Sequence, residues 1–344
     1  MTAATVIDER REFTVLRLQE FKGALTDNAE KVTENTACVY VTGSGGRGEM
    51  SSHSDLDVFI VSDIVVSDIE SSSEDAAQAA KPKLSNLDAI LLKAELIRAI
   101  RTPGLKFPDF SKDGKFLEGH TVHDLCLNLG KPEDDHANTF TARLLLLLES
   151  KPILGVDTYR RVIDKVIDSY WRDYDEHQSD FRPVFLINDI IRMWKTLCIN
   201  YEAFTEKKPD EKRAKRKLSN YKLKHSRALT CYSAVVYLMQ VFSEQHTVSR
   251  TDVQALTGLS PTERLQWVTG RPCFAHGDAI SRLLEVYGEF LRKTDHSEAE
   301  LIKIFMDQAR TKELVGDDSR MANTIVELLQ KMGAENELYR YLIV

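Results

Sequence analysis

The segment from Gly43 to Asp57 contains the residue types and spacings that could do chemistry: a glycine-rich run with one serine, followed by Asp-Leu-Asp. If Asp55 and Asp57 begin a strand, their side chains point to one side while Leu56 points into the core, because strand side chains alternate between faces. Two carboxylates at this spacing repel each other unless a cation lies between them. Their hard oxygen atoms suit Mg²⁺ or Mn²⁺, which complete their coordination with water and phosphate oxygens.

The glycine-rich run before these aspartates suits a phosphate group. Glycines at positions 43, 45, 46 and 48 let backbone N–H groups come close to an anion, and Ser44 adds a hydroxyl donor. Taken alone, such a run is most often a plain turn, and Asp-x-Asp is most often a solvated strand edge. Their occurrence together, between two apolar runs, favours phosphoryl or nucleotidyl transfer. No Gly-Lys-Ser/Thr follows the glycines, which excludes a Walker A loop.

The same motif resembles a known superfamily. The polymerase-beta-type nucleotidyltransferases share its parts, which here are Gly43-Ser44, Arg47-Gly48-Glu49 and Ser54-Asp55-Leu56-Asp57 before an apolar strand. The likeness is greatest to the branch with the protein-PII uridylyltransferases and glutamine-synthetase adenylyltransferases, including uncharacterised bacterial proteins of that branch. It is specific over residues 43–61 and weaker over the rest of the chain.

The resemblance implies an active site on this segment. Gly43 and Ser44 would hold the phosphates of a nucleoside triphosphate, and we add Gly45 and Arg47 of the same turn as nucleotide contacts. Asp55 and Asp57 would be the catalytic residues that bind two Mg²⁺ or Mn²⁺ ions.

A third acidic residue, on a later strand, is usual in that superfamily, and two candidates are present. Glu118 lies within an apolar run, where a charge needs a functional reason. Asp113 stands in an Asp-Gly pair that prefers a turn. However, the stretch Gly119-His120-Thr121-Val122 resembles the uridylyltransferases, in which the acid stands six positions before the glycine, at Asp113 here. We favour Glu118 as the third catalytic carboxylate, keep Asp113 as the alternative, and interpret His120 as structural.

Basic residues recur at helical spacing further along the chain. Within a helix predicted over 211–243, spacings of +4, +3, +4 and +3 place five residues on one face: Arg213, Lys217, Asn220, Lys224 and Arg227. A basic stripe on a chain of net charge -7 suits a triphosphate or an RNA acceptor. We predict nucleotide contacts for Lys217, Lys224 and Arg227; the alternative is an ordinary solvated face.

A helix predicted over 183–205 is mostly apolar but carries Asn188, Arg192 and Lys195 at +4 and +3. Basic residues on a buried helix are costly unless they are paired or face a ligand. We predict that Arg192 and Lys195 bind the nucleotide in a cleft between two domains. Asp189 offers the alternative of structural pairing.

The hydrophobic periodicity predicts an α+β chain. Apolar runs at 37–41 and 56–61 predict two strands joined by the glycine-rich turn, after a helix over 8–33. A helix is expected over 84–100 and a further strand at 115–118. Beyond about residue 121 strand signals nearly vanish, and the pattern predicts helices over 138–150, 156–174, 183–205, 211–243, 250–256, 261–268, 275–293, 298–312 and 319–334. Ser260 and Pro261 form a helix start, with Ser260 as the cap.

The length of 344 residues allows two domains. We expect a small α/β nucleotidyltransferase catalytic domain with a mixed sheet over 1–125 and a larger all-helical domain over 126–344, with the nucleotide and acceptor cleft and a possible partner surface. The net charge of -7 argues against non-specific coating of nucleic acid. Five scattered cysteines indicate reduced thiols, and no apolar run approaches the length of a membrane span. A cytoplasmic protein without a membrane partner is expected.

The sequence therefore predicts a metal-dependent enzyme that moves a nucleoside monophosphate from a nucleoside triphosphate to an acceptor hydroxyl and releases pyrophosphate. The resemblance favours a protein acceptor over RNA or a small molecule. Two alternatives stay open: a non-catalytic nucleotide-sensing or partner-binding module of the same fold, and a toxin or defence nucleotidyltransferase that acts on RNA.

Overall fold

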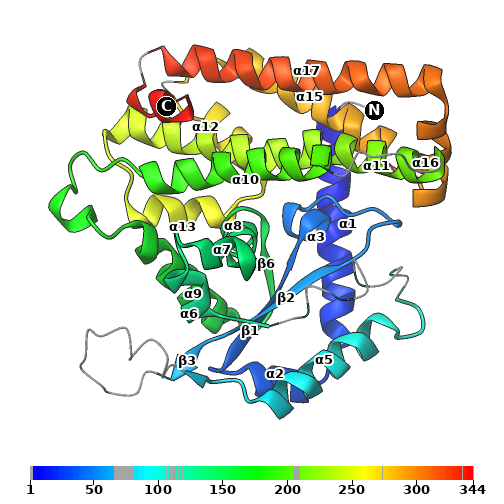
Figure 1. The fold of residues 1–344 in the computed structure, drawn as a ribbon, viewed down its shortest axis with the longest axis vertical. Helices are drawn as coiled ribbons and strands as arrows, with labels where there is room; N and C mark the ends of the chain where they lie inside the picture. Colours follow the sequence, from blue (N-terminus) through cyan, green and yellow to red (C-terminus); the bar gives the residue numbers. More distant parts are fainter. Residues whose placement is uncertain are drawn as a thin grey trace. The chain divides into compact units, whose positions relative to one another are not determined.

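In the computed structural model, the two apolar runs around the glycine-rich turn are neighbouring strands of one sheet (Figure 1). β1 (Ala37–Thr42) and β2 (Asp57–Ser62) pair antiparallel, β6 (Lys151–Leu154) pairs antiparallel with β1, and β5 (His120–Thr121) pairs in parallel with β2. The strand order is β5-β2-β1-β6, and because it combines parallel and antiparallel pairs the sheet is mixed, as predicted.

The structure describes residues 3–65, 81–105, 107, 110, 114, 117, 119–203, 210–272, 274–334 and 336–343.

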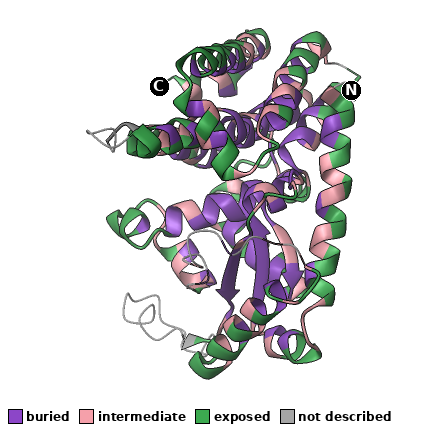
Figure 2. Ribbon diagram, turned by 90° about the vertical axis from the view of Figure 1, so that its right-hand side faces the viewer, coloured by how far each residue is buried: buried purple, intermediate pink, exposed green. Residues whose placement is uncertain are grey.

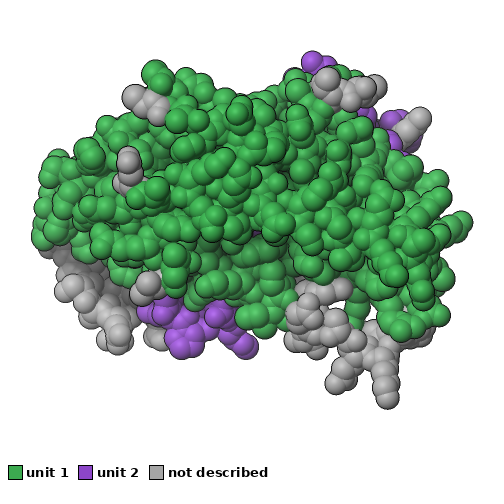
Figure 3. All heavy atoms as spheres, turned by 90° about the horizontal axis from the view of Figure 1, so that it is seen from above, with its two compact units in different colours: residues 1–11, 170–344 green, residues 12–169 purple. Residues whose placement is uncertain are grey.

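The chain divides into two compact units, which Figure 3 shows in different colours. The sheet unit comprises Glu12–Ser169, and the helical unit comprises Met1–Arg11 with Tyr170–Val344. The division therefore comes well after the boundary that the sequence suggested near Leu125. The reason is that β6, and α8 (Thr139–Glu149) before it, follow that point in the sequence but pack against β1.

The two central strands, β1 and β2, are buried on both faces apart from Asp57, and most of their length is coloured as buried in Figure 2. On one face, Val41 lies opposite Val58 in a core completed by helices α1 (Ala3–Gly23), α2 (Asp27–Thr33) and α5 (Asn86–Ile100). On the other face, the rings of Tyr40 and Phe59 stack with their centroids 5.6 Å apart. The apolar runs on these strands are thus nearly continuous because neither face meets water.

The remaining elements of the sheet unit are short, except for the helix α9 (Val156–Tyr170). The short ones are α3 (Gly43–Arg47), α6 (Val122–Leu127), α7 (Pro132–His136) and a separate pair of strands, β3 (Ile64–Val65) and β4 (Lys81–Pro82). The single helix expected over 8–33 is two helices, α1 and α2. Gly23 ends the first and Thr26-Asp27 begins the second, in agreement with the preference for glycine at helix ends and for threonine at helix starts.

The described part of the helical unit contains helices and no strand, which confirms the all-helical prediction for this part of the chain. Its α-helices are α10 (Val184–Ala203), α11 (Asp210–Lys222), α12 (Ala228–Gln245), α13 (Arg250–Gly258), α14 (Pro261–Thr269), α15 (Gly277–Lys293), α16 (Glu298–Met306) and α17 (Gln308–Gly333), with 3-10 turns η2 (Tyr174–Glu176) and η4 (Glu337–Leu342). Ser260 caps α14 as predicted, in a capping box with Glu263. None of the described helices combines the length and the apolar character that crossing a membrane requires.

Asp63, directly after β2, ties several parts of the sheet unit together. Its carboxylate is 3% exposed and accepts hydrogen bonds from Lys165 of α9 at 2.7 Å and from Lys83 at 3.1 Å, and Arg161 lies 3.7 Å away. Burial raises the pKa of Asp63, but hydrogen bonds from Lys165, from the Ile64 amide and from Lys83 outweigh it, so the pKa lies below its ordinary value. The ionised carboxylate therefore stabilises the end of β2 against α9.

The substitution Asp63→Asn should lower the free energy of unfolding by about 1–3 kcal/mol near pH 7, because it removes the charged acceptor of these hydrogen bonds. A lowered pKa in the folded state means that this stabilisation is present above the ordinary aspartate pKa of about 4 and is lost as the pH falls below it. Urea unfolding of both proteins from about pH 7 to about pH 3 measures the difference. Asp157→Asn, at an exposed carboxylate of the same α9, is the matched control. If the difference in the free energy of unfolding between Asp63→Asn and the unmodified protein did not become smaller at low pH, the role given to Asp63 would be contradicted.

Candidate active site

The glycine-rich run forms one short helical turn, α3, directly after β1 (Figure 1). Gly43 has φ +63°, a conformation that residues with a side chain rarely adopt. A Cβ atom on Gly43 would lie 2.3 Å from Oδ2 of Asp57. Glycine at this position therefore lets the Asp57 carboxylate lie directly against the turn.

The two aspartates stand where β2 begins. Asp57 is its first residue and is half-buried, and Asp55 is exposed just before it. Leu56 and Val58 are each 1% exposed and lie in the core, so the alternation expected around Asp57 is present. A turn from Ser51 to Ser54, closed by a hydrogen bond from the Ser54 amide to the Ser51 carbonyl at 3.1 Å, leads the chain into this pair.

Other residues of the turn are held by packing. Ser44 is half-buried, and its carbonyl accepts a hydrogen bond from the Glu49 amide at 2.8 Å. A Cβ atom on Gly45 would contact Val41, and one on Gly46 would lie 1.8 Å from the carbonyl oxygen of Glu149. Gly46 is thus required by the close approach of α8, independently of any ligand.

Glu149, the last residue of α8, clamps the turn. Its side chain is fully buried; Oε1 accepts a hydrogen bond from the Gly43 amide at 3.1 Å, and Oε2 accepts one from Arg47 at 3.2 Å. Arg47 also donates to Glu49 at 2.7 Å and is 8% exposed. The structure thus shows Arg47 between two carboxylates, and its predicted contact with a nucleotide stays a prediction.

Sequence reasoning missed Glu149. The available signal was a single charged residue at the end of the apolar run over 144–148, where burial is expected. Its partners lie about a hundred residues earlier in the chain, with no spacing that connects them.

The donor set next to the turn fits a hard divalent cation. Asp55 and Asp57 supply carboxylate oxygens, and the absent side chain of Gly43 leaves the Asp57 carboxylate in contact with a turn that has a hydroxyl. Both candidates for the third carboxylate, Asp113 and Glu118, lie outside the described residues. Within the described residues, which omit those two, no three acidic, histidine or cysteine side chains gather as a set of metal ligands.

The region of the third strand differs from the prediction. Of the run expected at 115–118, Leu117 alone is described; it is buried and lies in a 3-10 turn. On the side of β2 away from β1, the neighbouring strand is β5, in which His120 lies opposite Val61. The His120 ring stacks near Phe59 with centroids 6.4 Å apart, which agrees with a structural histidine.

The predicted basic stripe is not one straight helical face. The chain from 211 to 243 is α11 and α12 joined by a π-helical turn, η3 (Leu223–Arg227), and a π-turn shifts the angular position of every later residue. Lys217 is exposed, and Arg227 is half-buried within the π-turn. Lys224 forms an ion pair with Asp318 of α17 at 3.2 Å.

The basic residues of α10 differ in environment. Arg192 lies 3.4 Å from Asp189, as the structural alternative proposed, and the hydroxyl of Tyr170 donates to the same carboxylate at 2.7 Å. Lys195 is exposed.

The structure thus brings Gly43, Ser44, Gly45, Arg47 and Asp57 together in the sheet unit, with Asp55 beside them. The other predicted contacts, Arg192, Lys195, Lys217, Lys224 and Arg227, belong to the helical unit.

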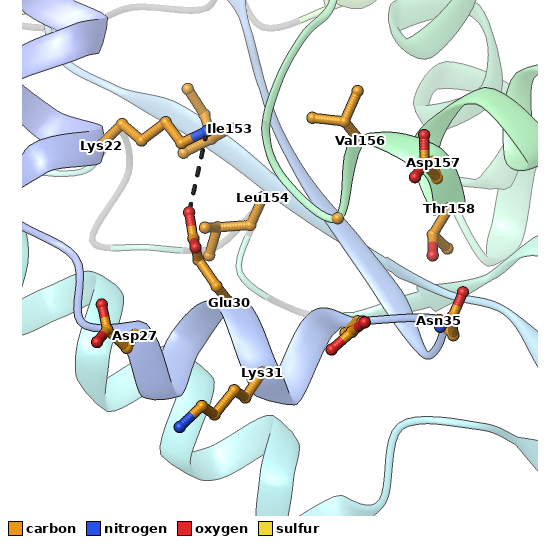
Figure 4. A pocket seen from close by; sticks show the side chains of 12 residues that line it. Lys22, Asp27, Glu30, Lys31, Asn35, Ile153, Leu154, Val156, Asp157 and Thr158 are labelled. Carbon is orange, nitrogen blue, oxygen red and sulfur yellow. Dashed lines mark ion pairs between the residues drawn. The ribbon is translucent and has the colours of Figure 1, made fainter.

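A pocket of about 530 Å³ lies elsewhere in the sheet unit (Figure 4). It is lined by Lys22 of α1 and by residues in or next to α2, β6 and the start of α9, and none of them belongs to the turn or to Asp55–Asp57. Figure 4 shows the side chains of Lys22 and Glu30 directed at each other. They form an ion pair in which Nζ of Lys22 lies 4.0 Å from Oε1 of Glu30. The pocket is lined by both lysines and carboxylates. Among its described lining residues, no glycine turn is packed against a carboxylate, as Gly43 is packed against Asp57.

Comparison with known proteins leads to the same turn. Residues 21–102 match the family model of the nucleotidyltransferase domain. The matched span contains the whole of Gly43–Asp57 and therefore includes α3 and both aspartates. The match supports nucleotidyl transfer as the general activity. No curated protein and no solved structure matches the chain at a significant level.

The substitution Glu149→Ala should destabilise the sheet unit by about 3–5 kcal/mol, because it removes one of the two carboxylates that pair with the buried Arg47 and leaves the Gly43 amide without its acceptor. Glu149→Gln, which retains a neutral acceptor, should cost less. Urea unfolding measures both, with Glu133→Ala at an exposed position as the control. Equal stability of Glu149→Ala and the unmodified protein would show that the clamp contributes nothing.

Proposed function

We propose that this protein is a metal-dependent nucleotidyltransferase that transfers a nucleoside monophosphate from a nucleoside triphosphate to an acceptor hydroxyl. The observation that carries the proposal is the contact of the Asp57 carboxylate with Gly43 in a turn that also has Ser44. The family match over residues 21–102 gives independent support.

In this proposal the turn and the aspartates have different tasks. The Ser44 hydroxyl and the backbone around Gly45 bind the triphosphate, while Glu149 keeps the turn rigid from behind. Asp55 and Asp57 hold two Mg²⁺ or Mn²⁺ ions. When bound, such ions neutralise the triphosphate and stabilise the charge that develops on the leaving pyrophosphate.

The reaction itself is a displacement at the α-phosphate. The acceptor oxygen forms a bond to the α-phosphorus, the bond to the β-phosphate oxygen breaks, and pyrophosphate leaves. The acceptor hydroxyl loses its proton to a carboxylate, for which Glu118 is our first candidate and Asp113 the second. Exposed Lys195 and Lys217 are candidates for contacts with the triphosphate or the acceptor, together with Arg192, Lys224 and Arg227.

The acceptor is proposed to be a protein. The support is the resemblance of the Gly43–Val61 motif to the uridylyltransferase and adenylyltransferase branch, whose members modify proteins. A cytoplasmic location is proposed from the five scattered cysteines, which indicate reduced thiols. An RNA acceptor, as in a toxin or defence enzyme, and a non-catalytic nucleotide sensor are the alternatives that the following experiment separates.

The purified protein with Mg²⁺ or Mn²⁺, each α-labelled nucleoside triphosphate in turn, and cell extract should label a protein band. The substitution Asp57→Asn should reduce the labelling by roughly 1000-fold, because it removes a charged metal ligand at the reacting phosphate. Asp27→Asn, at an exposed carboxylate away from the turn, is the matched control and should label normally. Label in RNA would favour the RNA alternative. Nucleotide binding without labelling of any acceptor would favour the sensor.

A further inference from the structure

The hydroxyl of Thr42 is buried and has no hydrogen-bond partner among the residues that the structure describes. Thr42 is the last residue of β1 and is 2% exposed, and its hydroxyl makes no hydrogen bond with any of the described residues. Threonine at a helix start commonly accepts a hydrogen bond from the first turn, yet Thr42, which precedes α3, forms no such cap. A buried hydroxyl without a partner destabilises a fold, so its position calls for an explanation.

Thr42 lies directly opposite Asp57. The two residues are Cα partners in the antiparallel register of β1 and β2. Side chains that are directly opposite lie on the same face, with Cβ atoms about 4.5–5.5 Å apart. Val41 and Val58, one step away, are in the core of the other face. The side chains of Thr42 and Asp57 are therefore cross-strand neighbours on one face of the sheet, and Gly43, the next residue, provides the space in which the Asp57 carboxylate lies.

A second hydroxyl on this face provides a comparison. The Tyr40 hydroxyl is also buried and has no hydrogen-bond partner within the described residues. Tyr40 lies opposite Phe59 and stacks on its ring, so its cross-strand neighbour has no polar group. Of these two hydroxyls, the one at Thr42 has a carboxylate as its cross-strand neighbour.

We propose that Thr42 is a positioning residue for Asp57: its hydroxyl donates a hydrogen bond to the Asp57 carboxylate when that carboxylate turns to bind a divalent cation. This inference rests on the proposed metal-binding role of Asp57. Carboxylates that bind metals are commonly oriented by hydrogen bonds from neighbouring groups, and loss of such a bond lowers metal affinity by roughly 10–100-fold. The hydrogen bond would also give the buried hydroxyl the partner that it otherwise lacks.

The test uses Thr42→Val, which keeps the shape and removes the hydroxyl, and Thr42→Ser, which keeps the hydroxyl. Free Mn²⁺, followed by electron paramagnetic resonance during titration of the full-length protein, measures metal affinity without nucleotide or acceptor. Thr42→Val should weaken Mn²⁺ binding by roughly 10-fold or more, and Thr42→Ser should restore most of it. Tyr40→Phe is the matched control and should bind Mn²⁺ like the unmodified protein.

Thermal unfolding without metal separates positioning from a structural role. If the Thr42 hydroxyl has no partner, Thr42→Val should raise Tm by roughly 2–4 °C, since an unsatisfied buried group is removed. A lower Tm together with unchanged Mn²⁺ affinity would overturn the proposal in favour of a structural hydrogen bond.

The outcomes also separate this inference from the proposed function. If Asp57→Asn abolishes Mn²⁺ binding while Thr42→Val binds normally, the metal site stands and the role of Thr42 is refuted. If Thr42→Val binds weakly but no acceptor is ever labelled, the inference stands and the proposed transfer is refuted. If the unmodified protein binds no Mn²⁺, the inference is refuted together with the metal role of Asp57.

Discussion

The buried contact between Glu149 and the glycine-rich turn is the interaction on which the candidate site depends. One carboxylate oxygen receives the Gly43 amide and the other receives Arg47, and both partners are shielded from water. Removing one partner of such a buried set leaves an uncompensated charge, so the end of β1, the turn and the end of α8 are held as one unit. The Asp57 carboxylate lies against the same glycine, and its position is therefore defined by how firmly the turn is held.

This arrangement distinguishes the motif residues with a structural role from those that we propose to face a ligand. Arg47 lies between Glu49 and Glu149, and Gly46 allows the close approach of the α8 backbone. Packing and charge compensation therefore account for Gly46, Arg47 and Glu49 of the motif. Ser44, Asp55 and Asp57, which are half-buried or exposed, are the residues to which the proposed function assigns chemistry.

In the helical unit, a local irregularity changes the meaning of a charge pattern. The π-turn at Leu223–Arg227 contains His225, which is fully buried and whose Nδ1 lies 2.9 Å from the Tyr221 carbonyl oxygen. The side chain thereby contacts a backbone carbonyl within the irregular turn. The neighbouring Lys224 forms an ion pair with Asp318, so part of the apparent basic stripe serves contacts within the unit. Burial lowers the pKa of His225 to about 4, which keeps the ring neutral in this network.

The sequence by itself determined the local features of this protein: the two strands around the turn, the opposite sides taken by Leu56 and Asp57, and the Ser260 cap. Each of these depends on residues a few positions apart, where strand alternation and capping rules apply. The tertiary structure alone decided that β6 completes the sheet, that Arg47 is buried between carboxylates, and that Glu149 clamps a turn about a hundred residues earlier. Such contacts join segments whose separation leaves no periodic pattern in the sequence, because they arise when α8 packs against β1.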